Sequence, residues 1–395
     1  MRITRVEAIP LWASFVEALG GADQVPEELS SPAFGMQSTP LTGQGCVCVR
    51  IHTDEGLVGV GESMGRPGAR GAAAHIEEVL APLLIGQDPL AVEVHWAAMS
   101  RQLRFAPMTV SGVDIALWDL RGQVWGASIH QLLGGPYRTA VDVYASPIPF
   151  LPTPDASADW ARRFLDDGFM AVKLKIGRGV GGDLEHVAAV RAAIGRGVPL
   201  LVDANGAYGV ADSVLLARGL VREDVYWLEE PVAQEYPEAL AEVRRRVDLP
   251  IASGEGLGSI HQFTALLDAG GADVVMPNVT RCGGITGFRR VAEAAAIRKR
   301  TVAPHGVGSG IGITASLHAI AATENFLIYE YNQLFNPLRH AILSAPLDFA
   351  GGRLTVPTTP GLGTAVDEAA LKRFRARSGV ADVGMDLAAV RAAAG

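Results

Sequence analysis

The sequence contains little cysteine, which limits the kinds of fold open to it. Three of its 395 residues are cysteine, an odd number in a long chain, and this argues against a disulfide framework. Cys46 and Cys48 lie two residues apart in an apolar run. We expect both to be buried on one face of a strand as small hydrophobic residues, and not to form a metal or redox site.

The sequence also lacks an excess of basic residues and long uninterrupted hydrophobic runs. Its 34 Lys and Arg residues are outnumbered by 42 Asp and Glu residues, a net charge of −8, so no nucleic-acid partner is expected. No segment reaches the ~18 apolar residues that a membrane span requires. Glu7 and Pro10 interrupt the first apolar run too early for a signal peptide. We therefore predict a cytoplasmic protein with no membrane partner.

The sequence does contain enough hydrophobic material for a large core, 49% of residues against 19% charged. Residues 1–130 mix strand and helix patterns, with a β-hairpin predicted over 46–62 and a helix predicted from Val110. Residues 13–41 have weak periodicity, and their only charged residues are acidic. We predict a lid loop there, because long irregular segments in compact domains are usually functional; a solvated acidic loop is the alternative.

Residues 138–340 alternate short β-branched runs with Ala-rich helical stretches. The predicted strands lie at 141–146, 170–176, 199–204, 225–230, 249–255, 272–277, 300–305 and 325–330. This alternation predicts a parallel α/β sheet of eight strands that closes into a barrel, with an open doubly wound sheet as the alternative. Residues 345–395 are too few to fold alone, so we expect them to pack back on the N-terminal part.

A polar residue ends most of these strands. The six are Lys175, Asp203, Glu229, Glu255, His305 and Glu330. Successive members lie 25 to 28 residues apart, or 50 residues apart between Glu255 and His305. Because one strand, one helix and two loops take about that length, we expect all six at the C-terminal rim, where the active sites of such barrels form.

Three of the six are carboxylates on neighbouring strands: Asp203, Glu229 and Glu255. In a dry barrel mouth they would repel one another unless a cation lay among them, and an all-oxygen ligand set suits Mg²⁺ better than zinc. The alternative role is helix capping or pairing with a surface arginine. We favour that role for Glu230, because adjacent residues of a strand face opposite sides.

Two lysines, Lys173 and Lys175, lie on one face of the second strand and should point into the barrel. Two ammonium groups near a divalent cation lower each other's pKa, and a lysine poised near neutrality can act as a general base. A structural pair of salt-bridged lysines and a Schiff-base lysine are the alternatives. His305, on the seventh strand, should face a central ligand from a different side than Lys175.

These residues lie in short motifs that resemble, as a set, the enolase superfamily and specifically its mandelate racemase branch, the mandelate racemase/muconate lactonizing enzyme family. The motifs are VKLK (172–175), DAN (203–205), WLEEP (227–231), SGE (253–255), CGGITG (282–287), APHGVGSGIGITASLH (303–318) and PGLG (360–363). The resemblance implies a (β/α)7β TIM-like barrel over 138–340. It also implies an α+β capping domain formed by residues 1–130 and the C-terminal segment.

The resemblance implies a role for each matching residue. It makes Asp203, Glu229 and Glu255 ligands of one Mg²⁺ per active site, Lys175 the base, Lys173 its electrostatic modulator and His305 the second acid/base. Asn205 and Glu330 match positions that contact the substrate. The branch usually has an Asp that supports the catalytic His, whereas this chain has Asn278, an amide that can orient the imidazole but cannot stabilise imidazolium by charge.

The predicted reaction is Mg²⁺-dependent removal of the proton α to a carboxylate, with stabilisation of the resulting enediolate. Dehydration of a sugar acid or small hydroxy acid is the first prediction, and racemisation or epimerisation of an α-substituted carboxylic acid is the alternative. The acidic lid suggests a substrate whose far end is neutral or cationic. A Schiff-base aldolase and a non-catalytic barrel are the alternatives from other classes. We also expect the chain to form a homo-oligomer.

Overall fold

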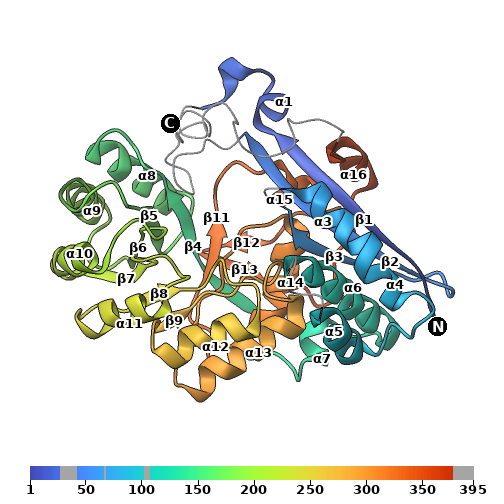
Figure 1. The fold of residues 1–395 in the computed structure, drawn as a ribbon. Coiled ribbons are helices and arrows are strands. Elements are labelled where there is room, and N and C mark those ends of the chain that lie inside the picture. Colours follow the sequence, from blue (N-terminus) through green and yellow to red (C-terminus); the bar gives the residue numbers. More distant parts are fainter. Residues whose placement is uncertain (27–41, 66–67, 102–106, 377–395) are drawn as a thin grey trace, which may run out of the picture.

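The computed structural model describes residues 1–26, 42–65, 68–101 and 107–376. These residues form a three-stranded antiparallel sheet near the N-terminus and a larger, mainly parallel sheet in the second part of the chain. Figure 1 shows the parallel strands surrounded by helices on one side of the molecule and the N-terminal sheet on the other.

The N-terminal sheet is a meander with the order β1-β2-β3. Its strands are β1 (Ile3–Ser14), β2 (Gly43–Thr53) and β3 (Val58–Met64). The predicted hairpin forms between β2 and β3, with Cys48 paired to Glu62. Cys46 and Cys48 are buried and free, as expected from their place in an apolar strand.

Helices follow this sheet in the chain, and several of them pack on it. They are α3 (Ala69–His75), the π-helical η3 (Ile76–Leu80), α4 (Ala81–Leu84), α5 (Val92–Ser100), α6 (Pro107–Trp125) and α7 (Ile129–Leu132). The long helix α6 packs closely on β3, because a Cβ atom added at Gly61 would lie 2.0 Å from the carbonyl oxygen of Gly112. Glycine in β3 therefore lets the helix approach the sheet directly.

The predicted lid region divides into two parts. Residues 13–14 complete β1, and Ser14 then caps the short helix α1 (Phe15–Leu19), followed by the 3-10 helix η1 (Ala22–Gln24). The first half is therefore more regular than the expected loop. Residues 27–41 of that prediction lie outside the described residues, so its function as a lid remains a prediction.

The second part of the chain is the predicted barrel. Its strands are β4 (Ala140–Ile148), β5 (Val172–Lys175), β6 (Leu200–Asp203), β7 (Val225–Glu229), β8 (Ile251–Ser253), β9 (Val274–Val275), β10 (Thr301–Val302) and β11 (Tyr329–Asn332). Neighbouring strands pair in parallel from β4 to β10, and β11 pairs in parallel with β4. The bridge between Val302 and Phe326 completes the ring. The sheet is closed, so the open doubly wound alternative is wrong.

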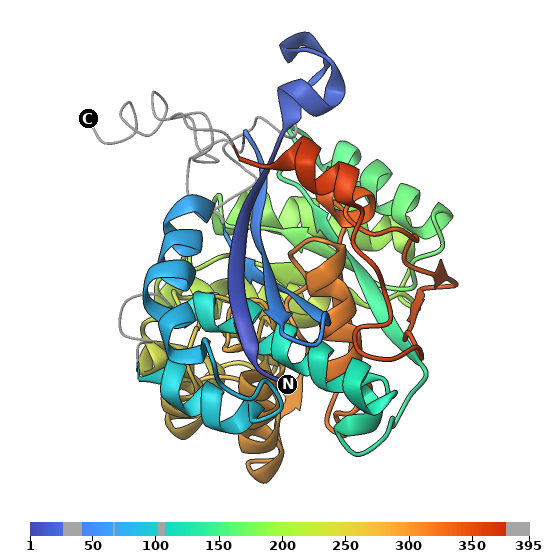
Figure 2. The same ribbon diagram turned by 90° about the vertical axis from the view of Figure 1, so that its right-hand side faces the viewer.

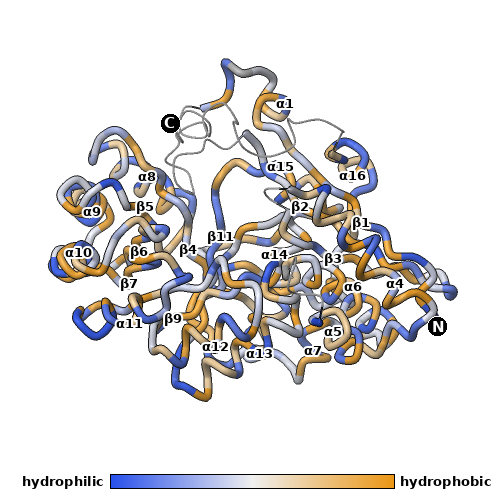
Figure 3. The backbone as a smooth tube through the Cα atoms, in the orientation of Figure 1, coloured by the Kyte–Doolittle hydropathy of each residue, from blue (hydrophilic) through white to orange (hydrophobic). Residues whose placement is uncertain are grey.

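Seven helices connect the eight strands of residues 140–332, which is the arrangement named (β/α)7β. They are α8 (Pro154–Asp166), α9 (Val180–Ile194), α10 (Val210–Arg222), α11 (Pro237–Arg245), α12 (Ile260–Ala269), α13 (Gly284–Ile297) and α14 (Gly310–Ala321). Figure 3 shows hydrophilic stretches on outer helices such as α11, while hydrophobic stretches lie toward the interior. The fold prediction is confirmed, because alternating strands and helices form a parallel sheet and the strand pairing closes that sheet into a barrel.

The C-terminal segment contacts both parts of the molecule. Helix α15 (Pro337–Ala341) precedes this segment, which contains β12 (Phe349–Ala350), β13 (Arg353–Thr355) and α16 (Glu368–Phe374). Residues 377–395 of the predicted segment lie outside the described residues. Strand β13 pairs with β4 of the barrel, whereas Arg375 forms a bridge with Leu11 of β1. Figure 2 shows α16 beside the upper part of the N-terminal strands. No helix within the described part of the chain is long and apolar enough to cross a membrane.

Candidate active site

The register of the barrel strands brings three of the predicted site residues side by side. Lys175 is paired with Asp203 across β5 and β6, and Asp203 is paired with Glu229 across β6 and β7. Each of the three is the last residue of its strand. Glu255 and His305 lie two and three residues beyond the ends of β8 and β10. All of them therefore lie at the same, C-terminal rim of the barrel.

The three predicted metal ligands form one cluster. Asp203, Glu229 and Glu255 each offer a carboxylate oxygen, and these oxygens lie within 4.8 Å of one another. Burial is the main reason that the pKa of Glu229 is raised well above its usual value, and repulsion from Asp203 raises it further. A divalent cation bound by oxygen ligands would relieve that repulsion, so the donor set fits a hard ion such as Mg²⁺.

Lys173 is buried beneath this cluster. Its Nζ lies 2.9 and 3.0 Å from the two oxygens of Glu229 and 3.3 Å from Oε1 of Glu330. Burial lowers the pKa of Lys173, but the carboxylates of Glu229, Glu330 and Asp203 outweigh burial and raise it well above its usual value. Lys173 is therefore a fixed positive charge that holds two carboxylates in place.

Lys175 lies higher in the barrel and lines the cavity. Its Nζ contacts Oδ2 of Asp203 and donates to Oδ1 of Asn205 at 2.7 Å. Burial lowers the pKa of Lys175, but Asp203 counteracts this effect and, with Glu255 and Glu229, raises the pKa. The lowered pKa values predicted for the two lysines assumed a divalent cation beside them and stay a prediction, because the raised pKa values reflect the surrounding carboxylates without the ion.

His305 lies on another side of the ring from Lys175. Going round the barrel, two strands separate β5 from β10 in one direction and four in the other. The Nε2 atom of His305 lies 3.3 Å from Oε2 of Glu255 and 3.6 Å from Oε2 of Glu330. Its Nδ1 atom lies 2.9 Å from Nδ2 of Asn278. The structure thus places Asn278 against His305, as the sequence comparison with the mandelate racemase branch suggested.

Asn205 and Glu330, the predicted substrate-contacting residues, both line the cavity. Asn205 has the left-handed φ of 43°, which turns its side chain toward Lys175 and Glu255. Burial raises the pKa of Glu330, but Lys173 opposes this effect and contributes to a pKa below the usual range. Each residue supports a neighbouring charged group, and their contact with substrate remains a prediction.

Glu230 lies in the site, and the prediction that it faces away is wrong. It is buried, lines the same cavity as Glu255 and has a φ of 37°. The strict alternation of side chains holds only while the backbone stays extended. Because Glu230 follows the last residue of β7 in a left-handed conformation, its side chain turns toward the rim, and its Oε1 accepts a hydrogen bond from the amide of Gly254.

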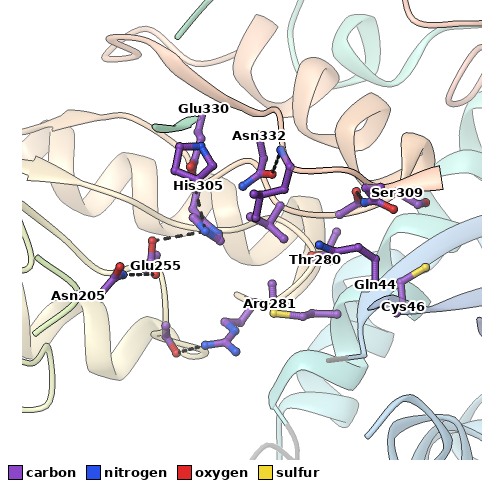
Figure 4. Close-up of a pocket in the computed structure, with 18 of the residues that line it drawn as sticks. Gln44, Cys46, Asn205, Glu255, Thr280, Arg281, His305, Ser309, Glu330 and Asn332 are labelled. Atoms are coloured by element: carbon purple, nitrogen blue, oxygen red, sulfur yellow. Dashed lines mark hydrogen bonds and ion pairs between the residues drawn. The ribbon is translucent and has the colours of Figure 1, made fainter. Parts of the chain in front are cut away.

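The cavity has a volume of about 410 Å³ and receives side chains from both sheets. Figure 4 shows Gln44 and Cys46 of β2 on the side opposite Asn205 and Glu255. Glu62 of β3 and Arg281, which follows β9, also line it. The sequence analysis missed these residues. Of these residues, Glu62 could have been noticed in the sequence, because it is an acidic residue within an apolar strand pattern. Its contact with the barrel could not be predicted, because the two are far apart along the chain.

Glu62 joins the N-terminal sheet to the barrel. Its carboxylate accepts hydrogen bonds from the amides of Ser309 at 2.9 Å and Gly312 at 2.8 Å, at the first turn of α14. It also accepts one from the hydroxyl of Ser309. Burial raises the pKa of Glu62, although these hydrogen bonds oppose that effect. The carboxylate of Glu62 thus binds the N-terminus of α14 and connects the two sheets at one side of the cavity.

Comparison with known proteins gives two family matches that together span most of the chain. Residues 24–134 match the mandelate racemase/muconate lactonizing enzyme N-terminal domain, and residues 156–370 match the enolase C-terminal domain-like family. The second match alone covers more than half of the chain, and the first covers strands β2 and β3 of the N-terminal sheet and the helices that follow them.

Several relatives are similar over nearly their full length. A D-galactarolactone cycloisomerase from Agrobacterium fabrum is 37% identical over 346 residues, which are 83% of this chain and 91% of that protein. An arabinonate dehydratase from Saccharolobus solfataricus is 30% identical over 84% of this chain and 91% of its own length. A racemase from Streptomyces coelicolor, solved with bound magnesium, is 28% identical with a TM-score of 0.83, covering 95% of this chain and all of that one.

These relatives agree with the predictions made from the motifs. The predicted superfamily and branch are confirmed by both family matches, and the predicted class, lyase or isomerase, is confirmed by relatives named as dehydratases and cycloisomerases. The magnesium in a related structure agrees with the carboxylate cluster. The comparisons leave the roles of the individual site residues as predictions.

Proposed function

This chain belongs to the mandelate racemase/muconate lactonizing enzyme family of the enolase superfamily, and on that premise we propose that it dehydrates a small sugar acid with Mg²⁺ as its cofactor. The proposed substrate has a carboxylate, an α-hydrogen and a β-hydroxyl group. Relatives named as dehydratases of arabinonate and galactonate support this class. The cavity of about 410 Å³ has room for one molecule of that size.

Lys175 is the proposed base. Its Nζ lines the cavity beside the metal-ligand cluster, where it can reach the α-hydrogen of a substrate whose carboxylate lies at Asp203, Glu229 and Glu255. Asn205 accepts a hydrogen bond from Lys175 and so orients the amine. His305 faces the same space from another strand and is placed to contact the hydroxyl that leaves.

The metal-ligand cluster fits Mg²⁺. Asp203, Glu229 and Glu255 would hold one ion per active site, and their oxygens are the hard ligands that Mg²⁺ prefers. When bound, Mg²⁺ supplies positive charge that offsets these carboxylates and stabilises the negative charge that develops on the substrate carboxylate. Lys173 donates to both oxygens of Glu229 and so holds that carboxylate in position for this purpose.

One observation supports this proposal above the others: a lysine amine and three clustered carboxylates line up on the ends of consecutive strands. Racemisation is the second candidate, and the related racemase with bound magnesium favours it. The two reactions share the first proton transfer. They differ in whether a hydroxyl group is then lost.

The proposal is tested by following the α-hydrogen in D₂O across a set of mono-acid, di-acid and amino-acid substrates. We expect exchange or loss of that hydrogen, with a 2-keto acid as product, for at least one sugar acid. Lys175→Ala should lower the rate by ~10²–10⁴-fold, the usual contribution of a positioned base. Chelation of the metal should also abolish turnover.

The exposed lysine Lys372 on α16 offers a matched control, and Lys372→Ala should keep the wild-type rate. Product with an inverted α-carbon and an intact β-hydroxyl group would replace dehydration by racemisation. Turnover that persists in Lys175→Ala would contradict the assignment of the base.

A further inference from the structure

A chain of hydrogen bonds leads from Thr280 through Asn278 to His305. The Oδ1 atom of Asn278 accepts from the amide of Thr280 at 2.9 Å and from its hydroxyl at 2.7 Å. The Nδ2 atom of Asn278 lies 2.9 Å from Nδ1 of His305 and donates to the carbonyl of Val307 at 3.3 Å. Asn278 and Thr280 are both buried, so water does not compete for these contacts.

These partners fix which end of the Asn278 amide faces His305. The amide N–H of Thr280 can only donate and the carbonyl of Val307 can only accept. If the side chain were flipped, its NH₂ group would face a donor and its oxygen would face an acceptor. The Nδ2 group therefore points at the imidazole, and Nδ1 of His305 must accept a hydrogen bond from it.

An accepting Nδ1 determines the position of the proton on the ring. In a neutral imidazole one nitrogen accepts and the other donates, so the proton lies on Nε2. An imidazolium would place a second N–H against the N–H of Asn278 at 2.9 Å.

We propose that Asn278 and Thr280 are positioning residues that hold His305 as a neutral imidazole protonated on Nε2. In that form His305 donates a hydrogen bond from Nε2 to the leaving hydroxyl group but does not transfer a proton in either step. This inference rests on the proposed dehydration. It assigns both proton transfers to Lys175 and only a hydrogen bond to His305.

Both proton transfers of the dehydration can be carried out by the amine of Lys175. The Cα–H bond breaks, its proton goes to Nζ of Lys175, and its electron pair remains as the enediolate. The C–O bond at the β-carbon then breaks as a Cα=Cβ bond forms, and the proton on Nζ passes to the departing oxygen, which leaves as water. The resulting enol becomes the 2-keto acid. Because one group serves both steps, the hydrogen and the hydroxyl group leave from the same face.

In the proposed form, His305 can neither accept the α-proton nor donate a proton to the leaving oxygen. Its Nε2 already bears a hydrogen, so this atom cannot accept the α-proton. Loss of that hydrogen would leave an imidazolate anion beside two carboxylates, which electrostatic repulsion disfavours. A hydrogen-bond donor aimed at developing negative charge still accelerates the reaction, since removal of one such donor typically costs ~10²–10³-fold.

Nitrogen NMR of protein labelled with ¹⁵N-histidine tests the tautomer directly and needs no turnover. His305→Gln identifies the signals of His305 by their loss. We expect the signals of a bare Nδ1 and a protonated Nε2, with or without Mg²⁺. In Asn278→Asp, where a carboxylate replaces the donor, the proton should appear on Nδ1. A wild-type His305 protonated on Nδ1 or on both nitrogens would overturn the proposal.

Substitutions at His305 test the consequence for catalysis. Glutamine can place an N–H group where Nε2 lies but cannot exchange protons, whereas leucine does neither. We expect His305→Gln to keep kcat within ~10-fold of wild type and His305→Leu to lose ~10²-fold or more. Equal, large losses of kcat in both variants would mean that His305 transfers a proton during the reaction, and would refute the inference.

Thr280 offers a further pair of variants. Thr280→Val removes the hydroxyl donor to Asn278 at similar size, and Thr280→Ser restores it. Because the backbone N–H of residue 280 and the carbonyl of Val307 still orient Asn278, we expect the wild-type tautomer of His305 to predominate in both variants, with a minor second tautomer in Thr280→Val and none in Thr280→Ser. A failure of all substrates to react would count against the proposed dehydration only, because the tautomer is measured in the resting protein.

Discussion

His318 and His130 form a buried pair whose protonation is set by one backbone carbonyl. His318 Nε2 lies 2.9 Å from the carbonyl oxygen of Leu362, so it donates there and its Nδ1 accepts from Nδ1 of His130 at 3.0 Å. The rings are stacked with their centroids 5.2 Å apart. Burial lowers the pKa of His318 from 6.5 to about 4. The fold therefore requires a neutral imidazole at this position.

This lowered pKa predicts a loss of stability in mild acid. The unfolded chain binds a proton below pH 6.5, whereas folded His318 resists it until about pH 4. Stability is thus fully present above pH 6.5 and falls as the pH drops toward 4. From pH 7 to pH 5 we expect the free energy of unfolding to fall by about 2 kcal/mol from this group.

Urea unfolding at both pH values measures that fall. His318→Gln keeps an N–H donor for the carbonyl of Leu362 but does not titrate. Between pH 7 and pH 5 its free energy of unfolding should therefore fall by about 2 kcal/mol less than that of wild type. Identical pH dependence in the two proteins would exclude His318 as the source.

The sequence was enough to predict the site residues whose positions follow from the repeat of strands and helices in the barrel. It was not enough for residues whose position or charge depends on one backbone angle or on a contact with a distant part of the chain. Asp203 and Glu229 could be predicted because each ends a strand, and neighbouring parallel strands end at one rim. Glu230 could not, since its left-handed φ has no pattern in the sequence. The pKa of Lys175 could not be predicted either, because it depends on the distances from its amine to carboxylates on other strands, which spacing along the chain does not give.

At the scale of elements, helix α14 depends on a cap from another sheet. Glu62 of β3 accepts from the amides of Ser309 and Gly312 at its first turn. Glu62→Gln would turn an NH₂ group toward one of these donors. We expect the variant to lose about 1–3 kcal/mol of stability, the usual cost of an unsatisfied buried donor, measured as a lower urea midpoint.

An exposed carboxylate provides the control for that variant. Glu324→Gln changes the same charge at an exposed position just after α14 and should leave the midpoint unchanged. A Glu62→Gln protein as stable as wild type would show that the helix does not depend on this cap.

The elements themselves could be predicted well because their signal is local. The hairpin of β2 and β3 and all eight barrel strands lie at the predicted segments, since β-branched runs and helical periodicity are properties of adjacent residues. The contact of β3 with α14 could not be predicted, because Glu62 and Gly312 are 250 residues apart and no periodicity relates them.

At the scale of the whole molecule, the carboxylate cluster should couple metal binding to stability. Repulsion between Asp203 and Glu229 is present in the folded protein and absent from the unfolded chain. Because a ligand that binds only the folded state stabilises it, Mg²⁺ at ~100 times its Kd should add about 2.7 kcal/mol. We expect a rise of a few degrees in the melting temperature, reversed by a chelator.

Glu229→Gln separates this effect from general salt effects. The variant loses one ligand and one source of repulsion, so its melting temperature should respond to Mg²⁺ much less than that of wild type. Equal responses of both proteins to Mg²⁺ would place the ion elsewhere.

The C-terminal segment, which pairs with both β4 and β1, has a consequence for how the chain folds during synthesis. Strand β1 leaves the ribosome before the barrel strands, but its bridge to Arg375 and the contact of Asp119 with Leu362 form only after those strands have emerged. The N-terminal sheet is therefore synthesised before the barrel but gains its last contacts after the barrel is complete, and until then part of its surface has no partner.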